Sequence, residues 1–478
     1  MERRDFLQWM ISAGLGTLLL PAPVLATSGG RAQRGFHDIE GGPQLQEGKA
    51  KAVILIWLAG GMAHTETFDP KPRVEFRKGL ESRQVLSTFD SIPTAIDSIR
   101  FSAGLGEIAS VMDRGSLVRS WKGPDLGPVL HTRHQYHWHT GYVPPQALLV
   151  PHIGSWVSQV LGPRNDYAPQ FVEIGQSFDF GGAEEVRAYF TGGFLGSEFG
   201  PLHIPDPLQA VKSLKAPERL GQEGLRKRFE IFQKLYGNTD ELSGISDFHR
   251  NSIARSVESA ERLLFSPALQ AFQIENEPRN SFQRYNTGKF GIGCLLARRL
   301  IEAGSRFVEV SSEYVPFGMW DTHKNGHSRT KQLKEMVDMP IAQLVRDLEE
   351  RGILSETLVI VASEFSRVAG RNPGREGGEV DMILANASHY GLHRHFIDAG
   401  SVLFFGGGIR PGVVYGETRN EFPCDVVRDP VSVSDLHATM FHLLGIPPDF
   451  GYEVEARPFF VTSNGKGRVI DELIGRVV

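Results

Sequence analysis

The chain has 478 residues, of which 41% are hydrophobic and 22% are charged, an ordinary balance for a globular protein with a large core. There are 51 Lys and Arg against 56 Asp and Glu, so the formal charge is −5, which gives no electrostatic case for nucleic acid as a partner. The only cysteines are Cys294 and Cys424, too few for a thiolate zinc site, so any metal must be held by His, Asp and Glu.

The first 26 residues have the features of a twin-arginine export signal. Arg3 and Arg4 precede an apolar stretch that closes on the small residue Ala26, where we expect cleavage. This stretch is short and interrupted by Gly and Pro, so we expect no stable membrane insertion. We therefore expect a periplasmic or extracellular protein whose residues 27–50 form a linker. Twin-arginine export carries folded proteins, often with a metal already inserted, which favours a metal site.

An oxidising compartment would permit a disulfide between Cys294 and Cys424. Cys294 lies in an apolar helical stretch, however, where a buried free thiol is the simpler expectation. The sequence leaves the pairing open.

The predicted elements alternate between buried strands and helices along most of the chain. Short apolar stretches predict strands, and apolar residues at helical spacing predict helices. The first part contains strands at 52–61, 115–121 and 169–175 and a helix at 153–162. From about 205 to 285 the pattern becomes helical, at 224–237 and 251–266, which indicates an inserted helical segment. The remainder contains helices at 294–304, 340–352 and 431–446, and strands at 306–312, 357–363 and 400–408.

This alternation is typical of an α/β fold in which helices cover a mostly parallel sheet. We expect it to form one domain over residues 51–478. In such a sheet, the loops after the strands gather at one edge, so polar groups that are far apart in the sequence can meet around an ion.

Candidate metal ligands occur in four stretches, each at or near the end of a predicted strand. Carboxylate oxygens suit calcium or magnesium, whereas imidazoles favour zinc or another transition metal. We therefore expect one or two divalent ions. The candidate ligands are His64, Glu66, His131, Asp321, His323, Glu364, His393 and His395.

Simpler explanations exist for each of these residues. A single loop histidine is more often a hydrogen-bonding residue than a ligand, and the stretch "HTRHQYHWH" could be a polar loop. Glu364 could be the polar end of a core strand. Arg367, three residues further on, could clamp an anionic oxygen or form a surface ion pair. Asp321, His323 and Glu364 taken together favour the metal site.

Several stretches resemble a known family. "LEERGILSETLVIVASEF" and "SVSDLHATMFHLLGIPP" resemble segments of sulfatases. "AGGMAHTETFDPKP", "FGIGCLLARRLIEAGSRFVEV", "WDTHKNGH", "SEFSR" and "GLHRHFIDAGSVLFFGGG" resemble the exported bacterial family called domain of unknown function 1501. This resemblance implies the alkaline phosphatase and sulfatase superfamily, hence a three-layer α/β sandwich with a metal site at the strand ends.

The resemblance also suggests roles for particular residues. Asp321 and His323 fall where the superfamily has an Asp with a nearby His, and His395 or His393 falls at the last His. The chain departs from the superfamily where an Asp-His pair is replaced by Glu364-Phe365.

The nucleophile is a second departure from the superfamily. The position nine or ten residues before Thr140-Gly141, where a Ser, Thr or Cys is expected, falls on His131 and Leu130. Thr132, beside them, or Thr65 could be activated by a metal, or water could attack directly. The sequence leaves this choice open.

The expected function is that of an exported metal-dependent hydrolase acting on a phosphate or sulfate ester of a small molecule or glycan. The alternative is a non-catalytic binding or scaffold protein that keeps the fold without the nucleophile. Buried charges at the expected strand ends favour the hydrolase, since an abandoned site has no reason to retain them. The sequence does not reveal the substrate, the identity of the metal or the oligomeric state.

Overall fold

A computed structural model describes residues 36–175, 192–214, 220–237, 247–312, 319–370 and 382–474. The predicted signal, residues 1–26, lies outside this range. At the centre is an eight-stranded sheet. Strand β12 is antiparallel to both of its neighbours, whereas every other neighbouring pair in this sheet is parallel. The strand order is β13 (Val414–Tyr415), β5 (Gly115–Val118), β12 (Val402–Phe405), β9 (Thr357–Ala362), β2 (Ala52–Trp57), β8 (Phe307–Ser311), β6 (Phe171–Ile174) and β7 (Leu202–Ile204).

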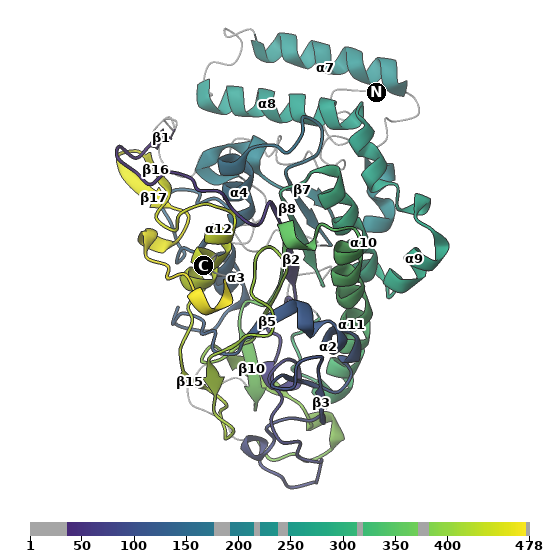
Figure 1. The fold of residues 1–478 in the computed structure, drawn as a ribbon, viewed down its shortest axis with the longest axis vertical. Coiled ribbons are helices and arrows are strands. Elements are labelled where there is room, and N and C mark those ends of the chain that lie inside the picture. Colours follow the sequence, from purple (N-terminus) through teal and green to yellow (C-terminus); the bar gives the residue numbers. More distant parts are fainter. Residues whose placement is uncertain are drawn as a thin grey trace.

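Both faces of the sheet are covered, so the strands at its centre, β2 and β9, consist almost entirely of apolar residues. In β2, Ile54 and Ile56 pack on one face, and Val53, Leu55 and Trp57 pack on the other. Figure 1 shows α10 and α11 on one side of β2 and α3 and α12 on the other. The first layer contains α2 (Gly106–Ser110), α10 (Lys289–Ala303) and α11 (Gly326–Glu350); the second contains α3 (His131–Thr140), α4 (Ile153–Leu161) and α12 (Val433–Leu443). The predicted three-layer α/β sandwich is confirmed.

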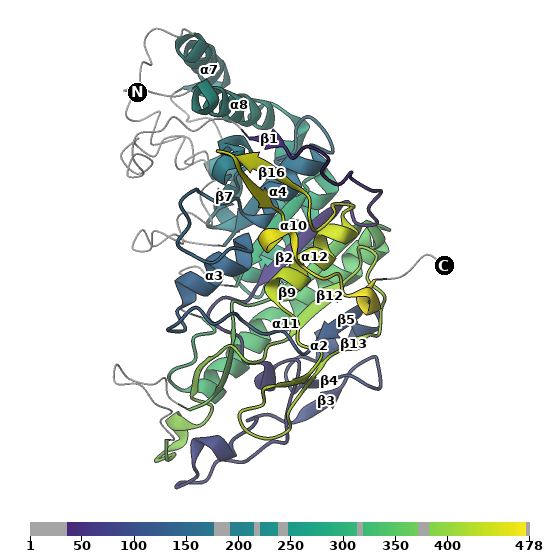
Figure 2. The ribbon, with the colours of Figure 1, turned by 90° about the vertical axis from the view of Figure 1, so that its left-hand side faces the viewer.

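A helical segment separates β7 from α10, in the stretch where the sequence predicts one. Its amphipathic helices bury residues such as Phe229 and Val257 and turn charged residues outward. Figures 1 and 2 show α7 and α8 side by side at one end of the molecule. The segment contains α6 (Ala210–Ser213), α7 (Gly221–Gly237), α8 (Asp247–Leu264) and α9 (Arg279–Tyr285).

Several elements differ from the simplest expectation. The His-rich stretch, for which a polar loop was an alternative, forms helix α3. The part of the predicted linker that the structure describes is held against the domain, because β1 (His37–Asp38) pairs with β16 (Gly451–Val454). Outside the central sheet, β10 (Ser366–Ala369) and β11 (His393–Phe396) form an antiparallel pair. The smaller strands are β3 (Ser91–Pro93), β4 (Arg100–Ser102), β14 (Glu417–Thr418), β15 (Val426–Arg428) and β17 (Arg457–Phe460).

Cys294 and Cys424 are both buried free thiols, so the expectation of a free Cys294 is confirmed. Burial raises the pKa of Cys424 to about 12 and that of Cys294 further, which makes both thiols unreactive. Among the described residues, no helix combines the length and apolar character needed to cross a membrane.

Candidate metal site

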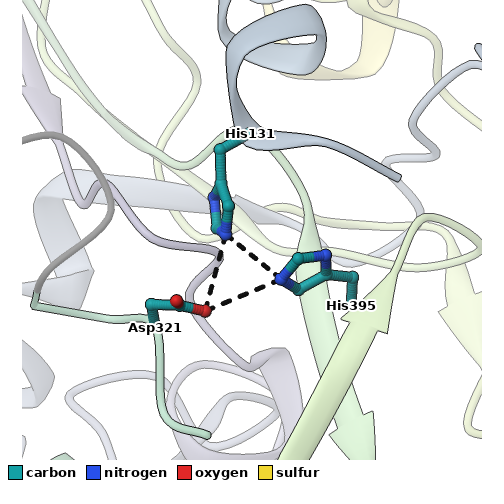
Figure 3. A group of neighbouring side chains, drawn as sticks. All are labelled: His131, Asp321 and His395. Atoms are coloured by element: carbon teal, nitrogen blue, oxygen red, sulfur yellow. Dashed lines mark hydrogen bonds and ion pairs between the residues drawn. The ribbon is translucent and has the colours of Figure 1, made fainter. Parts of the chain in front are cut away.

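Three of the predicted ligands converge at one point beside the sheet (Figure 3). His131 is the first residue of α3, Asp321 lies in the loop that leads from β8 to α11, and His395 lies in β11. Nε2 of His131 is 3.5 Å from Oδ1 of Asp321, Nε2 of His395 is 3.6 Å from the same oxygen, and the two Nε2 atoms are 3.1 Å apart. Ligands of a tetrahedral zinc ion lie roughly 3.3 Å from one another, so the spacing within the triad of His131, Asp321 and His395 suits one ion.

The hydrogen bonds behind both imidazoles direct their Nε2 lone pairs at Asp321. Nδ1 of His395 lies 2.8 Å from the carbonyl oxygen of Val129, and Nδ1 of His131 lies 2.6 Å from Oε1 of Glu364. Both oxygens are acceptors, so each Nδ1 must carry the proton, and Nε2 of the neutral ring is left unprotonated. Protein ligands to metals are commonly held in this way, with the second ring nitrogen donating to a carboxylate or carbonyl.

Glu364 stands behind His131 rather than within the triad. Its carboxylate accepts hydrogen bonds from the backbone N–H of Gly60 at 2.9 Å and from Oγ of Ser363 at 3.0 Å, besides contacting His131. Burial, the largest single influence, raises the pKa of Glu364, but the contacts with His131 and the hydrogen bonds from backbone N–H groups together outweigh it, and the net pKa is lowered. The contacts therefore favour an orienting role for Glu364 over the direct ligation that the sequence suggests.

Arg367 is wholly buried beneath the triad, which contradicts the alternative of a surface ion pair. Its guanidinium contacts Oδ1 of Asp321 and donates to the carbonyl oxygen of Gly60 at 2.8 Å. Burial lowers the pKa of Arg367 to about 9, so it stays charged at neutral pH. Since Asp321 and Glu364 supply two negative charges against this one positive charge, the site still favours a cation.

His323 lies at the solvent edge of the triad. Its Nε2 is 2.9 Å from Oδ1 of Asp321 and 3.2 Å from Nε2 of His395, and its side chain is 38% exposed. Burial lowers the pKa of His323, and burial followed by the charge of Arg367 lowers that of His395 to about 2. Both rings are therefore neutral at physiological pH, as metal binding requires.

Three further predicted ligands form hydrogen bonds or close polar contacts away from the triad. His64 bonds Oγ of Ser366 at 2.7 Å and the carbonyl oxygen of Cys424 at 3.1 Å. Glu66 accepts from the backbone N–H of Thr88 and contacts Nε2 of His393 at 3.4 Å. Nδ1 of His393 in turn lies 3.2 Å from Oγ1 of Thr322, the residue after Asp321. Glu66 and His393 thus support the loop that carries Asp321.

Neither predicted hydroxyl nucleophile is joined to the triad by a hydrogen bond in the described part of the chain. Thr65 is buried in a short turn, and its carbonyl oxygen accepts from Oγ of Ser87 at 2.6 Å. Thr132 follows His131 in the first turn of α3 and is half-buried. Their catalytic roles stay predictions.

A second group, His139, His152 and Glu309, is completely buried between α3, α4 and β8. The backbone N–H of Gly154 donates to Nδ1 of His152, so Nε2 of the neutral ring carries the proton, and it lies 3.3 Å from Oε2 of Glu309. A proton at that nitrogen is incompatible with metal ligation. Nδ1 of His139 faces the carbonyl oxygen of Gln135, and its Nε2 is 3.1 Å from Oε1 of Glu309. The tautomer of His152 therefore favours a buried histidine–carboxylate cluster over a metal site.

Residues 50–474 match the model of a protein family described as "Protein of unknown function (DUF1501)". The chain belongs to the DUF1501 family. No curated protein matches this DUF1501 sequence.

The fold of this DUF1501 protein is similar to solved structures of alkaline phosphatases and sulfatases. Wild-type alkaline phosphatase PafA is 10% identical, with 91% of this chain and 100% of that chain covered and a TM-score of 0.42. The lipoteichoic acid synthase LtaP from Listeria monocytogenes is 8% identical, with 90% and 79% covered and a TM-score of 0.37. The PsFucS1 sulfatase from Pseudoalteromonas sp. is 13% identical, with 95% and 76% covered and a TM-score of 0.36. Structural similarity at this level indicates a common fold and does not establish an activity. The function must therefore be inferred from the geometry of the site.

Replacing Glu364 by Gln should weaken zinc binding by roughly 10- to 100-fold, the usual cost of losing a carboxylate that orients a ligand histidine. Gln keeps the size of the side chain but removes the charge that fixes the Nδ1 proton of His131. Competition against a chelating dye measures the affinity. Glu350→Gln, at the exposed end of α11, is the matched control. Equal zinc affinity in both variants would contradict the orienting role.

Proposed function

We propose that this DUF1501 protein is a metal-dependent hydrolase that cleaves phosphate or sulfate esters. One observation carries the proposal: His131, Asp321 and His395 point their donor atoms at one place, and each is held there by a neighbouring group, namely Glu364, Arg367 and the carbonyl of Val129. If these residues were only the polar ends of strands, two histidines would not need to have their protons fixed on Nδ1, the ring nitrogen that faces away from the triad. Orientation of this kind costs stability and is characteristic of functional sites.

The triad would hold a single divalent ion. Two imidazoles and one carboxylate favour zinc or another transition metal over calcium or magnesium. Three protein ligands leave a coordination position open, which is typical of catalytic rather than structural zinc sites. When bound, the ion would offset charge that develops on the transferring group and lower the pKa of bound water. His323 is either a fourth ligand or a donor to the substrate at the exposed edge.

The remaining residues have supporting roles in this proposal. Arg367 neutralises part of the charge of Asp321 and places a fixed positive charge beneath the anionic substrate. Glu364 holds His131 in one orientation. Thr132 or Thr65 would supply an attacking hydroxyl, or water would attack in its place. The substrate would be an ester of a small molecule or a glycan, met outside the cytoplasm if the export signal in residues 1–26 functions.

A binding or scaffold protein is the second candidate, and two observations favour it. Neither Thr132 nor Thr65 has a hydrogen bond to the triad, and the guanidinium of Arg367 already contacts the Asp321 oxygen that an ion would need. A protein of this kind would bind an anion without turning it over.

The deciding experiment is metal analysis of the exported protein combined with ester hydrolysis. We expect about one zinc or similar ion per chain, loss of activity toward p-nitrophenyl phosphate or p-nitrophenyl sulfate on chelation, and recovery on adding zinc. Zinc at one hundred times its Kd should also raise the free energy of unfolding by about 2.7 kcal/mol. A folded protein that contains no metal and takes none up would exclude the hydrolase and favour the binding protein.

A further inference from the structure

A groove of about 530 Å³ opens directly beside the triad. Its lining includes His323 and Lys324, which precede α11, and Ser388, His389 and His393, from the segment that leads into β11. His323 belongs to both places, because its Nε2 is also 2.9 Å from Asp321. A molecule held at the triad through one acidic group would therefore extend into this groove. Its volume is within the usual range for sites that bind small molecules.

The shape of the groove is set by the backbone. The N–H of Asn325 donates to the carbonyl oxygen of Ser388 at 3.3 Å, and the N–H of His327 donates to that of Tyr390 at 3.2 Å. Gly326 and Gly391 pack so closely that a Cβ at residue 326 would lie 1.4 Å from the carbonyl oxygen of Gly391. The start of α11 is thus joined to the loop before β11, and the two walls are fixed before a ligand arrives.

The chemistry of the groove suits an anion. None of the described side chains that line it is acidic, although the whole chain carries a formal charge of −5. Lys324 supplies a positive charge and forms no ion pair within the described parts of the chain, and the side chains of Asn325 and His389 supply hydrogen-bond donors. Of the described carboxylates that contact its lining residues, Asp321 is paired with Arg367, and Glu66 is buried and engaged by Thr88 and His393.

We propose that this groove binds the non-transferred part of the substrate and selects esters that carry a second acidic group, with Lys324 as the charged specificity residue. The substrate class is then a small ester with two phosphate or sulfate groups, such as a doubly phosphorylated or doubly sulfated sugar. The inference rests on the proposed function, since it takes the triad as the place where the first acidic group binds.

The test compares glucose 1,6-bisphosphate with glucose 1-phosphate on the metal-loaded protein and on two variants, Lys324→Met and Lys331→Met. Lys331 lies on the exposed side of α11, outside the groove, and is the matched control. We expect Lys324→Met to lower the ratio of kcat/KM for the bisphosphate over the monophosphate about tenfold, the order expected for losing a hydrogen bond to a charged group. We expect Lys331→Met to leave this ratio within about twofold of the parent.

Calorimetric titration of the same proteins with glucose 1,6-bisphosphate separates this inference from the hydrolase proposal. If the parent hydrolyses neither ester but binds the bisphosphate about tenfold more tightly than Lys324→Met does, the groove is supported and hydrolysis of these esters is not. If the monophosphate is hydrolysed and the two variants have equal ratios and equal affinities, the proposed function stands and the groove proposal is overturned. Failure of the parent to bind the bisphosphate also overturns it.

Discussion

Replacing Asp321 by Asn should abolish stoichiometric zinc binding and lower ester hydrolysis by roughly a thousandfold or more, because a metal ion contributes several kcal/mol to transition-state stabilisation. Asp321 supplies the one carboxylate of the triad, and its Oδ1 lies within 3.6 Å of Nε2 of both His131 and His395. An amide of the same shape would bind a divalent ion far more weakly. Metal content and kcat/KM toward p-nitrophenyl phosphate measure the two losses.

Asp321→Asn also leaves the buried guanidinium of Arg367 without its carboxylate, which would itself destabilise the fold. His395→Gln provides the necessary second variant, because it removes a ligand and leaves that ion pair in place. His249→Gln, on α8 in the helical insertion, is the control for loss of an imidazole remote from the site. A folded His395→Gln protein with full zinc content and activity would contradict the assignment of the triad.

Replacing Glu309 by Gln should lower the free energy of unfolding by about 3–5 kcal/mol, the usual cost of breaking a buried ion pair from one side. Glu309 lies in the middle of β8 with no exposed surface, and His139 and His152 contact its two oxygens at 3.1 and 3.3 Å. Gln would remove the only charge of Glu309, which the buried imidazoles of His139 and His152 face. Urea denaturation measures the change, with Glu335→Gln on the exposed side of α11 as the control.

The same pair predicts the direction of a pH effect. Burial by itself raises the pKa of Glu309, but His139 and His152 outweigh it and lower the value to about 2, from an ordinary value of 4.5. The stability contributed by the ionised carboxylate is therefore complete above pH 4.5 and is lost as the pH falls through the folded pKa. The stability difference between the parent and Glu309→Gln should accordingly shrink as the pH is lowered from 5 toward 2. A difference that stays constant over this range would show that Glu309 is not ionised in the fold.

Most helices and strands could be predicted because each is encoded by a short, local pattern. The side chains of the apolar run 357–363 are all buried only if the run is a strand inside a sheet covered on both faces. The apolar positions of 153–162 fall on one side of a helix. The direction of a strand has no such local pattern. The sequence around 400–408 is apolar whichever way it runs, so the antiparallel placement of β12 was decided by its pairing with β5 and β9.

Helix α3 was ambiguous for a related reason. From His134 to its last residue it is buried, although its residues are mostly polar, so the sequence has no apolar stripe to reveal the helical period. The burial of Glu309 was likewise hidden, although a glutamate inside the apolar stretch "FVEVS" is an unusual residue for a core strand and could have drawn attention to the pair.

The sequence by itself determined the fold class, the helical insertion and the set of side chains available to hold a metal, because periodicity and residue type are local properties. Only the tertiary structure decided which of those side chains meet. The antiparallel pairing of β10 with β11 places His395 opposite Arg367, and the start of α3 brings His131 to the same point, while His64, Glu66 and Glu364 are engaged by other partners. The contact of His131 with His395, which are 264 positions apart, depends on how strands and helices pack against each other, and no local pattern contains that information.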